Sequence, residues 1–433
     1  MFTSVFARRS LVHQGFARRS LVRGVIATLA VTSGTAAVFA APAGAATPAA
    51  TAASAVATSD ADVAARLTQR TGELALGSAW SGRVVSADGK VIWQRSATTG
   101  RAPGSNQKLV TAYVALRRLG PSRTLTTPVK QSRTSPSRLY LRGSGDPTLS
   151  TSRLRSAAYQ TSKVLKKQKR TKVFVHIDDT LFPKPTNATG WKASYVPGSV
   201  APVRALVVDG RNSSDTSMDA GWVFAQQLGR YGIGVTSVTR AKTPSSAITR
   251  ASTTSPNIGT MTSSMLRRSD NDYAEALWRL AAKQGGYATT WSGARSNALA
   301  VLRAGGVYRT NVRVNDGSGL SVSNRLTART TTDLLRRMRS SPAMRPYVFS
   351  STGLPVAGVS GTLTDRFTGV ASCARGKVQA KSGTLNGITA LSGEATAADG
   401  RRRTFSFLVT GVANEGAVKP MLDELAAIVQ GCR

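Results

Sequence analysis

Histidine and cysteine are both scarce in this chain, which has two of each among 433 residues. So few thiol and imidazole groups are a poor basis for a zinc site, and we predict no metal and no cofactor. A serine–histidine–aspartate site would depend on His176, because His13 lies close to the N-terminus. His176 stands in a short strand-like stretch without the glycine-flanked elbow that exposes such a serine. We therefore interpret it as an ordinary strand residue.

Long apolar runs are also missing. The one candidate, Val25–Ala41, is shorter than the roughly 20 residues that a transmembrane helix needs. Arginines precede it, Ala43-Gly44-Ala45 follows it, and the leader contains no acid. This order predicts a signal peptide over 1–45, and hence an exported protein that is extracellular or associated with the cell wall. A membrane anchor is the alternative, and Arg18-Arg19 leaves both Sec and twin-arginine export open.

Acidic residues are few. Lys and Arg number 58 against 21 Asp and Glu, which gives a formal net charge of +37. A charge of this size favours anionic partners. For an exported protein we expect these to be anionic polymers of the cell wall, and we expect no nucleic acid. The charge is spread over the chain, however, and a generally arginine-rich surface explains it equally well.

The only two cysteines are Cys373 and Cys432. An oxidising compartment outside the cytoplasm favours a disulfide between them. In the chain-entropy description, a bridge closing so long a loop stabilises the fold by roughly 4 kcal/mol. Two buried free thiols are the alternative.

The pattern along the chain indicates an α+β fold. Residues 46–59 are rich in Ala, Thr and Ser and are typical of a flexible linker. From about 126 to 255, short strands alternate with turn residues and helical pieces, which is typical of an α/β domain. Strands at both ends with helices between them predict one antiparallel sheet flanked by helices. We expect this catalytic domain to comprise 60–125 and 256–433, with a smaller α/β domain inserted at 126–255.

Individual elements follow from hydrophobic periodicity and turn residues. We predict an amphipathic helix that opens at Ser105, with Leu109, Tyr113 and Leu116 on its buried face. The other predicted helices are 60–74, 154–167, 221–227, 258–267, 272–282 and 418–429. The predicted strands are 78–85, 91–94, 139–141, 173–177, 205–208, 378–381, 388–395 and 404–411.

A serine and a lysine stand three residues apart in Ser105-Asn106-Gln107-Lys108, at the start of that helix. At this spacing they share one face, so the amine of Lys108 can reach the hydroxyl of Ser105. A neutral amine accepts the proton of the serine and makes it a nucleophile. Burial and a nearby second cation both lower the pKa of a lysine toward 7. Lys381 is the candidate for that cation. N–H groups at the helix start suit an oxyanion.

A second motif, Ser269-Asp270-Asn271, falls between two predicted helices. Ser269 is suited to relay a proton between the lysines and a leaving amine, and Asn271 to hold a substrate amide. The alternative is helix capping by Ser269 or Asn271, with Glu275 in the first turn of the following helix.

A third motif, Lys381-Ser382-Gly383, ends a predicted strand. Gly383 allows a ligand to approach the backbone. Lys381 and the hydroxyls of Ser382 and Thr384 suit a carboxylate, and the N–H of Thr384 is a candidate oxyanion donor. An ordinary turn is the alternative.

In this order the three motifs resemble those of penicillin-binding D-alanyl-D-alanine carboxypeptidases and endopeptidases. The type is the low-molecular-mass one, with a domain inserted between the S-x-x-K and S-x-N motifs. The resemblance runs from about Gly82 to the C-terminus, and Ser382 stands where threonine is usual. It also rests on four further stretches, which are Leu139–Leu149, Asp316–Ser321, Leu354–Leu363 and Gly383–Gly387.

The resemblance implies a transpeptidase/β-lactamase-like fold and a serine D,D-carboxypeptidase that acts on peptidoglycan stem peptides, with D,D-endopeptidase activity left open. β-Lactams would acylate the same serine. By motif, Ser105 would be the acylated nucleophile, Lys108 its base and Ser269 a proton shuttle. The substrate would be held by Asn271, Lys381, Ser382 and Thr384, and the N–H groups of Ser105 and Thr384 would form the oxyanion hole.

Two alternatives belong to other functional classes. A serine β-lactamase with an S-D-N motif would have a much shorter gap between its first two motifs and would lack the insert. A catalytically inactive, basic wall-binding protein would not need the motif side chains, all of which are of competent type here.

Overall fold

The computed structural model describes residues 58–432. The predicted signal peptide, and the predicted linker as far as residue 57, lie outside the described residues. Ser59 caps helix α1 (Asp60–Glu73), because its hydroxyl accepts from the N–H of Asp62 at 3.0 Å. Within the described part, no helix is long and apolar enough to cross a membrane.

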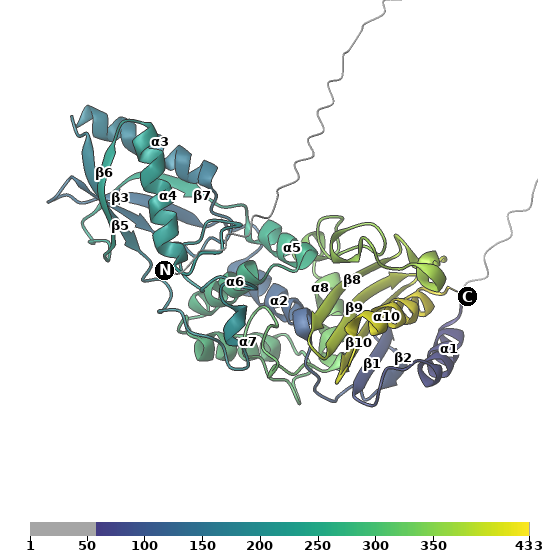
Figure 1. Cartoon of the computed structure of the whole chain (residues 1–433). Helices are drawn as coiled ribbons and strands as arrows, with labels where there is room; N and C mark the ends of the chain where they lie inside the picture. Colours follow the sequence, from purple (N-terminus) through teal and green to yellow (C-terminus); the bar gives the residue numbers. More distant parts are fainter. Residues whose placement is uncertain (1–57, 433) are drawn as a thin grey trace, which may run out of the picture. The chain divides into compact units, whose positions relative to one another are not determined.

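The first sheet combines strands from the two ends of the described chain, in the order β2-β1-β10-β9-β8 (Figure 1). Every neighbouring pair is antiparallel, as the sequence predicted. Asn386-Gly387 forms the tight turn between β8 and β9, where the sequence predicts a hairpin. The five strands are β1 (Trp80–Ser86), β2 (Val91–Arg95), β8 (Val378–Leu385), β9 (Ile388–Thr396) and β10 (Arg402–Thr410).

Helices cover both faces of this sheet because its central strands are apolar on both sides. Successive side chains of a strand point to opposite faces. Leu391 and Phe407 therefore join the core under α1 and α10 (Glu415–Gln430), whereas Ala390 and Leu408 join the core formed by the central helices. The central helices are α2 (Gln107–Leu119), α5 (Ile258–Arg268), α6 (Asn271–Gln284), α7 (Trp291–Ala304), α8 (Ala328–Ser340) and the short α9 (Arg345–Val348).

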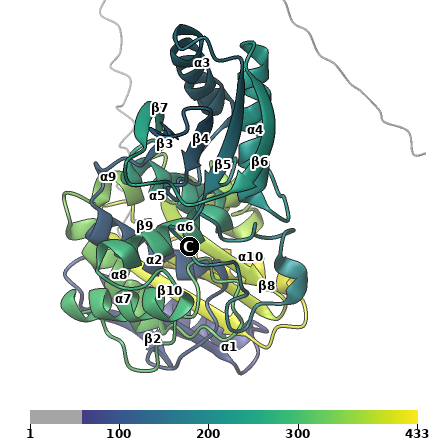
Figure 2. The ribbon, with the colours of Figure 1, turned by 90° about the vertical axis from the view of Figure 1, so that its left-hand side faces the viewer.

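The second sheet is drawn entirely from residues 126–254, in the order β6-β5-β4-β3-β7. β4, β5 and β6 run parallel, and β3 is antiparallel to both of its neighbours. Helices α3 (Thr151–Lys167) and α4 (Thr216–Arg230) pack against each other and against this sheet (Figure 2). That this segment is an inserted domain stays a prediction. Its strands are β3 (Thr126–Gln131), β4 (Arg138–Arg142), β5 (Lys172–Asp178), β6 (Gly234–Arg240) and β7 (Ile248–Thr254).

Helices α7, α8 and α9 were not predicted, and three details differ from the predicted strands. Residues 205–208 form no strand. Their apolar side chains reflect burial of Ala205, Leu206 and Val208 in a loop that makes one isolated bridge to Asp146. Strands β3, β6 and β7 were not predicted, because they contain few apolar residues and depend on neighbouring strands for their hydrogen bonds. Lys381 lies within β8 rather than at its end, because the strand continues to Leu385.

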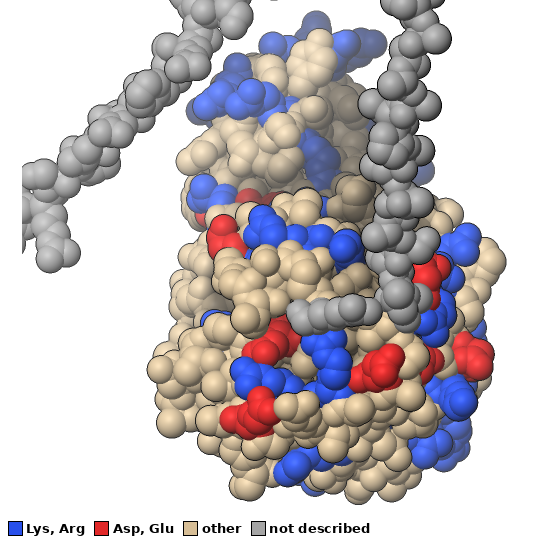
Figure 3. Space-filling model, turned by 90° about the vertical axis from the view of Figure 1, so that its right-hand side faces the viewer, with Lys and Arg blue, Asp and Glu red and all other residues tan. Residues whose placement is uncertain are grey.

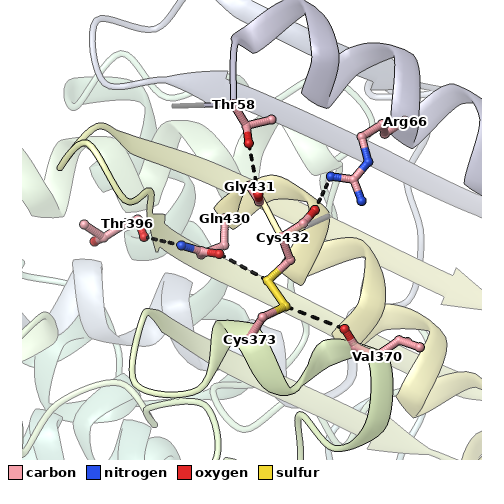
Figure 4. The surroundings of a disulfide bond; sticks show 8 residues. All are labelled: Thr58, Arg66, Val370, Cys373, Thr396, Gln430, Gly431 and Cys432. Atoms are coloured by element: carbon pink, nitrogen blue, oxygen red, sulfur yellow. Dashed lines mark hydrogen bonds between the residues drawn. A yellow bond between two sulfur atoms is a disulfide. The ribbon is translucent and has the colours of Figure 1, made fainter. Parts of the chain in front are cut away.

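Cys373 and Cys432 form the predicted disulfide (Figure 4). Cys373 lies in the 3-10 segment Gly369–Ala374, and Cys432 follows the end of α10. The same end of α10 is bound to the start of the described chain, because the hydroxyl of Thr58 donates to the carbonyl of Gly431 at 3.0 Å. Arg66 of α1 also donates to the carbonyl of Cys432.

Candidate active site

Ser105 lies in a single 3-10 turn, Gly104–Asn106, that leads directly into α2. Its side chain is half-buried, and the amine of Lys108 lies 3.1 Å from its hydroxyl oxygen. The predicted contact between these two residues is present. The predicted face of α2, with Leu109, Tyr113 and Leu116, is buried. Burial extends further than predicted, almost all round the helix, because α5, α6, α7 and α8 all pack against it. For the same reason Lys108 is completely buried.

Lys108 has two further partners besides Ser105. Its amine donates to Oδ1 of Asn271 and to the carbonyl oxygen of Ser318, each at 2.7 Å. A charged ammonium has three N–H donors, which matches these three contacts, whereas a neutral amine has two N–H donors and a lone pair. In the neutral state the lone pair can therefore face the Ser105 hydroxyl while the other two contacts persist.

The second motif occupies the sharp turn between α5 and α6. Ser269 ends α5 in the left-handed region, with φ of 59°. Asp270 caps α6 by accepting from the N–H of Tyr273 at 3.0 Å. The alternative interpretation of this motif, capping by Ser269 or Asn271, is therefore wrong, because Asp270 fills that position. Asn271 is the first residue of α6, and besides accepting from Lys108 it donates from Nδ2 to the carbonyl of Ser199 at 2.8 Å.

The third motif is joined to the second by Lys381. Its completely buried amine donates to the hydroxyl of Ser269 at 2.9 Å and to the carbonyl of Ser382 at 2.8 Å. Half-buried Ser382 and exposed Thr384 lie on the same edge strand. The hydroxyl of Ser382 lies 2.7 Å from that of Thr362, which sequence reasoning did not single out.

Strand β8 lies directly against the turn that carries Ser105. A Cβ atom added to Gly383 would lie 2.7 Å from the carbonyl oxygen of Pro103 and 3.2 Å from the backbone nitrogen of Ser105. A Cβ atom added to Gly104 would lie 3.3 Å from the backbone nitrogen of Thr384. The two N–H groups predicted as oxyanion donors therefore belong to adjoining backbone segments, and glycine is what allows this approach.

Burial pushes both lysines toward the neutral state. The pKa of Lys108 is lowered to about 8 by desolvation, although Asp316, Glu275, Asp270 and Asp272 oppose this shift. The pKa of Lys381 is lowered well below its usual value by desolvation and, secondarily, by the charge of Lys108. The sequence predicts that burial and Lys381 lower the pKa of Lys108. In the structure burial does so, whereas the repulsion between the two amines lowers the pKa of Lys381.

Two carboxylates near the site were not predicted as functional residues. Glu275 is completely buried and accepts from the N–H of Ser318 at 2.7 Å instead of taking part in a cap. Asp272 accepts from the N–H of Ala201 at 2.7 Å, and burial raises its pKa to about 6. In the sequence, Glu275 is marked as unusual only because it is an acid within a predicted helix whose neighbouring residues are mostly apolar.

His176 lies on β5, with Nδ1 2.9 Å from the hydroxyl of Thr239 on β6. Its partners belong to the second sheet, in keeping with the interpretation as a strand histidine. In residues 58–432 no group of three or more His, Cys, Asp or Glu side chains is placed to hold a metal ion.

Most of this chain matches a known family of enzymes. Residues 60–212 and 195–430 match the D-Ala-D-Ala carboxypeptidase 3 (S13) family. The chain belongs to this family. The predicted resemblance and the predicted enzyme class, a serine-type D-Ala-D-Ala carboxypeptidase, are confirmed, and neither alternative class is favoured.

Two curated relatives of this chain are also named carboxypeptidases. Carboxypeptidase DacB from Mycolicibacterium smegmatis is 31% identical over 376 residues, which are 81% of this chain and 80% of that protein. Carboxypeptidase Rv3627c from Mycobacterium tuberculosis is 31% identical over 403 residues, which are 87% of this chain and 86% of that protein. The similarity to both relatives therefore extends over most of each protein.

Among solved structures, the chain is similar to penicillin binding protein 4 (dacB) from Haemophilus influenzae. The TM-score is 0.72 at 19% identity, over 84% of this chain and 97% of that one. This likeness confirms the predicted fold class, an antiparallel sheet with flanking helices.

Proposed function

We propose that this protein is an exported D,D-carboxypeptidase in which Ser105 is the acylated nucleophile and Lys108 its base. One observation carries the proposal. The amine of Lys108 is completely buried, has a pKa lowered to about 8, and lies 3.1 Å from the hydroxyl of Ser105. A base with a pKa near the working pH and within hydrogen-bond reach is what general-base catalysis requires. The pattern of residues 1–45 supports export.

The contacts support an acyl-enzyme pathway. Neutral Lys108 takes the proton of Ser105 as the serine oxygen attacks the carbonyl carbon of the penultimate D-alanine. The N–H groups of Ser105 and Thr384 stabilise the resulting oxyanion. The leaving amine of the terminal D-alanine receives the proton that Lys108 took from the serine, relayed through Ser269, whose hydroxyl accepts from Lys381 at 2.9 Å. Water then attacks the ester carbonyl and gives one proton to neutral Lys108. Lys108 returns this proton to the oxygen of Ser105 as the shortened peptide leaves as a carboxylic acid.

We assign substrate binding to the part of the same cluster on β8, where Thr384 is exposed, Ser382 is half-buried and the amine of Lys381 lies beneath the surface. The hydroxyls of Ser382 and Thr384 and the amine of Lys381 are suited to the terminal carboxylate, and the amide of Asn271 is suited to a peptide group of the substrate. Peptidoglycan stem peptides, which end in D-alanine, are the expected substrates. Family membership and the names of the curated relatives support this assignment.

Covalent labelling tests the proposal. Fluorescent penicillin is expected to add once per chain, with peptide mapping placing the adduct on Ser105. The same preparation is expected to release D-alanine from a synthetic peptide that ends in D-Ala-D-Ala. Rapid nitrocefin hydrolysis without a lasting adduct would instead identify a β-lactamase. Folded protein that gives neither adduct nor D-alanine would support the inactive wall-binding protein.

We further propose that anionic wall polymers bind a cavity of about 700 Å³ beside α8. On the face seen in Figure 3, basic side chains are scattered with acidic ones among them, so spread charge by itself defines no binding site there. The cavity, in contrast, brings six arginines together, namely Arg329, Arg336, Arg337, Arg339, Arg345 and Arg402.

The acids in this cavity already have partners. Asp333 pairs with Arg83 at 3.0 Å, and Glu394 accepts hydrogen bonds from both Nε and Nη2 of Arg339. Four of the six arginines form no ion pair with any carboxylate of residues 58–432, namely Arg329, Arg336, Arg337 and Arg345. A concave surface focuses the electric field of charges that have no such partner. One guanidinium group can bind two oxygens of a phosphate at once. A phosphodiester polymer therefore fits this cavity.

Replacing both Arg336 and Arg337 by alanine is expected to weaken binding of poly(glycerol phosphate) by about tenfold or more and to reduce its salt dependence. Titration followed by fluorescence anisotropy at two salt concentrations measures both effects. Lys166 and Lys167, exposed at the end of α3, provide the matched double alanine control. An equal loss in both double variants would show that binding depends on overall charge and would contradict the proposal.

A further inference from the structure

Residues 316–318 connect two helices at the site through their backbone. Their three successive carbonyl groups all accept from side chains of α2. The amide of Gln107 donates to Asp316, the hydroxyl of Thr111 donates to Gly317 at 2.6 Å, and the amine of Lys108 donates to Ser318 at 2.7 Å. The carbonyl that orients Lys108 is thus part of a short, fully engaged segment.

The N–H groups of the same segment are held from the other side by Glu275 of α6. The carboxylate accepts from the N–H of Gly317 at 3.1 Å and from the N–H of Ser318 at 2.7 Å. Both Glu275 and Lys108 are completely buried. The backbone of Ser318 therefore links two sets of hydrogen bonds: its N–H is held by Glu275, and its carbonyl accepts from Lys108, which in turn contacts Ser105.

Close packing leaves the segment little freedom to move. A Cβ atom added to Gly317 would lie 2.7 Å from the carbonyl oxygen of Ala274 on α6. Gly319 has φ of 89°, and a Cβ atom there would collide with the carbonyl oxygen of Gly104, next to the proposed nucleophile. Glycine at both positions lets the segment fill the space between α6 and the turn that carries Ser105.

We propose that Glu275 is a positioning residue for the acylation step. Its carboxylate fixes the 317–318 backbone, so that the carbonyl of Ser318 holds the amine of Lys108 against the hydroxyl of Ser105. The inference rests on the proposed function in one respect, namely that Lys108 is the base. Nothing in the resemblance or in the motifs assigns a role to Glu275.

The charged groups around Glu275 give this role an electrostatic signature. Asp316 lies in the segment itself, Lys108 on α2, and Asp272 and Arg279 on α6. Burial, followed by the charge of Asp316, raises the pKa of Glu275 to about 7. The guanidinium of Arg279 lies over the ring of Trp291, 4.1 Å from its centroid. Ionised Glu275 favours the protonated form of Lys108, so removal of its charge lowers the pKa of Lys108 further.

Acylation by benzylpenicillin, followed by stopped flow over a range of pH, tests the proposal. In the wild type the rate should rise with pH through about 8, because the neutral fraction of Lys108 rises through its pKa. Glu275→Ala should slow acylation on the order of 100-fold, the effect of misplacing a catalytic group by about 1 Å. Glu275→Gln keeps one acceptor oxygen. Its rate should stay within about tenfold of the wild type, with the midpoint moved to lower pH.

Asp423→Ala is the matched control. Asp423 is also a buried carboxylate; it accepts from the backbone N–H of Phe367 at 3.2 Å and pairs with Arg366, in the core on the α10 side of the first sheet. Its loss should lower stability and leave both the acylation rate and its pH midpoint unchanged. Thermal unfolding of each variant separates loss of fold from loss of positioning.

Titration of ¹³C-labelled lysine by NMR gives a second readout that does not depend on activity. The signal that disappears in Lys108→Met reports the pKa of Lys108, which should be lower in Glu275→Gln than in the wild type. An unchanged Lys108 pKa together with an unchanged acylation midpoint would overturn the inference, as would equal effects in Asp423→Ala. If the wild type is not acylated at all, the proposed function fails, and the Lys108 titration still decides whether Glu275 acts on this amine.

Discussion

Ser105→Ala is expected to abolish covalent labelling by penicillin and release of D-alanine, with a rate loss on the order of 10⁶-fold, as for removal of other serine nucleophiles. The change removes the attacking oxygen and little else. Lys108 keeps its contacts with Asn271 and the carbonyl of Ser318, and the half-buried position leaves only a small void. Intact-mass analysis after incubation with benzylpenicillin measures the first effect, and a D-alanine assay measures the second.

Ser152→Ala is the control for this variant. Ser152 lies on α3, and its hydroxyl lies 2.9 Å from that of Ser150. It makes no contact with the three motifs, so this change should leave labelling intact. Thermal unfolding should show that the Ser105 and Ser152 variants are both folded. A penicillin adduct that persists in folded Ser105→Ala would place the nucleophile elsewhere and end the proposal.

Replacement of both Cys373 and Cys432 by serine is expected to lower the free energy of unfolding by about 4 kcal/mol. The bridge spans 59 residues of sequence, and the chain-entropy description gives that stabilisation for a loop of this length. A domain of this size would lose roughly 5 °C of melting temperature. Acylation at 25 °C should change little, because the bridge ties the 3-10 segment Gly369–Ala374 to the end of α10 and has no contact with the motif side chains.

Denaturant unfolding of the oxidised wild type and the double serine variant measures this loss. A reducing agent should bring the wild type toward the variant and should leave the variant itself unchanged. Equal unfolding free energies for the oxidised wild type and the variant would show that the hydrogen bonds around Gly431 and Cys432 hold the end of α10 without the bridge.

The elements that the sequence predicted well are those whose signals are local. Ser59 caps α1 at the start of the predicted helix 60–74, and the β8–β9 turn falls at Asn386-Gly387, between the predicted strands 378–381 and 388–395. The disulfide was predictable because two cysteines allow only one pairing within a chain. The elements that were missed, such as β6 and β7, have few apolar side chains, so their strand conformation depends on neighbouring strands that the local sequence does not reveal.

For the candidate site too, local sequence patterns predicted some features, and others depend on residues far apart in the chain. The order and spacing of the motifs predict that Ser105, Lys108, Ser269, Asn271 and Lys381 belong to one acyl-transfer site. In the structure, Lys108 is hydrogen-bonded to Ser105 and Asn271, and Lys381 is hydrogen-bonded to Ser269. The two groups are joined by the second motif, which contains both Ser269 and Asn271. The sequence did not indicate that Asp270 would be the cap.

By itself, then, the sequence determined the chemical groups of this enzyme, their order along the chain and the family to which it belongs. Only the tertiary structure decided which distant groups surround the amine of Lys108, how far burial lowers its pKa, and that Glu275 holds the segment that orients it. The physical reason is distance along the chain. Lys108 meets Asn271 across 163 residues and Ser318 across 210. Desolvation depends on such distant neighbours, whereas helix caps and turn signals act within a few residues of one another.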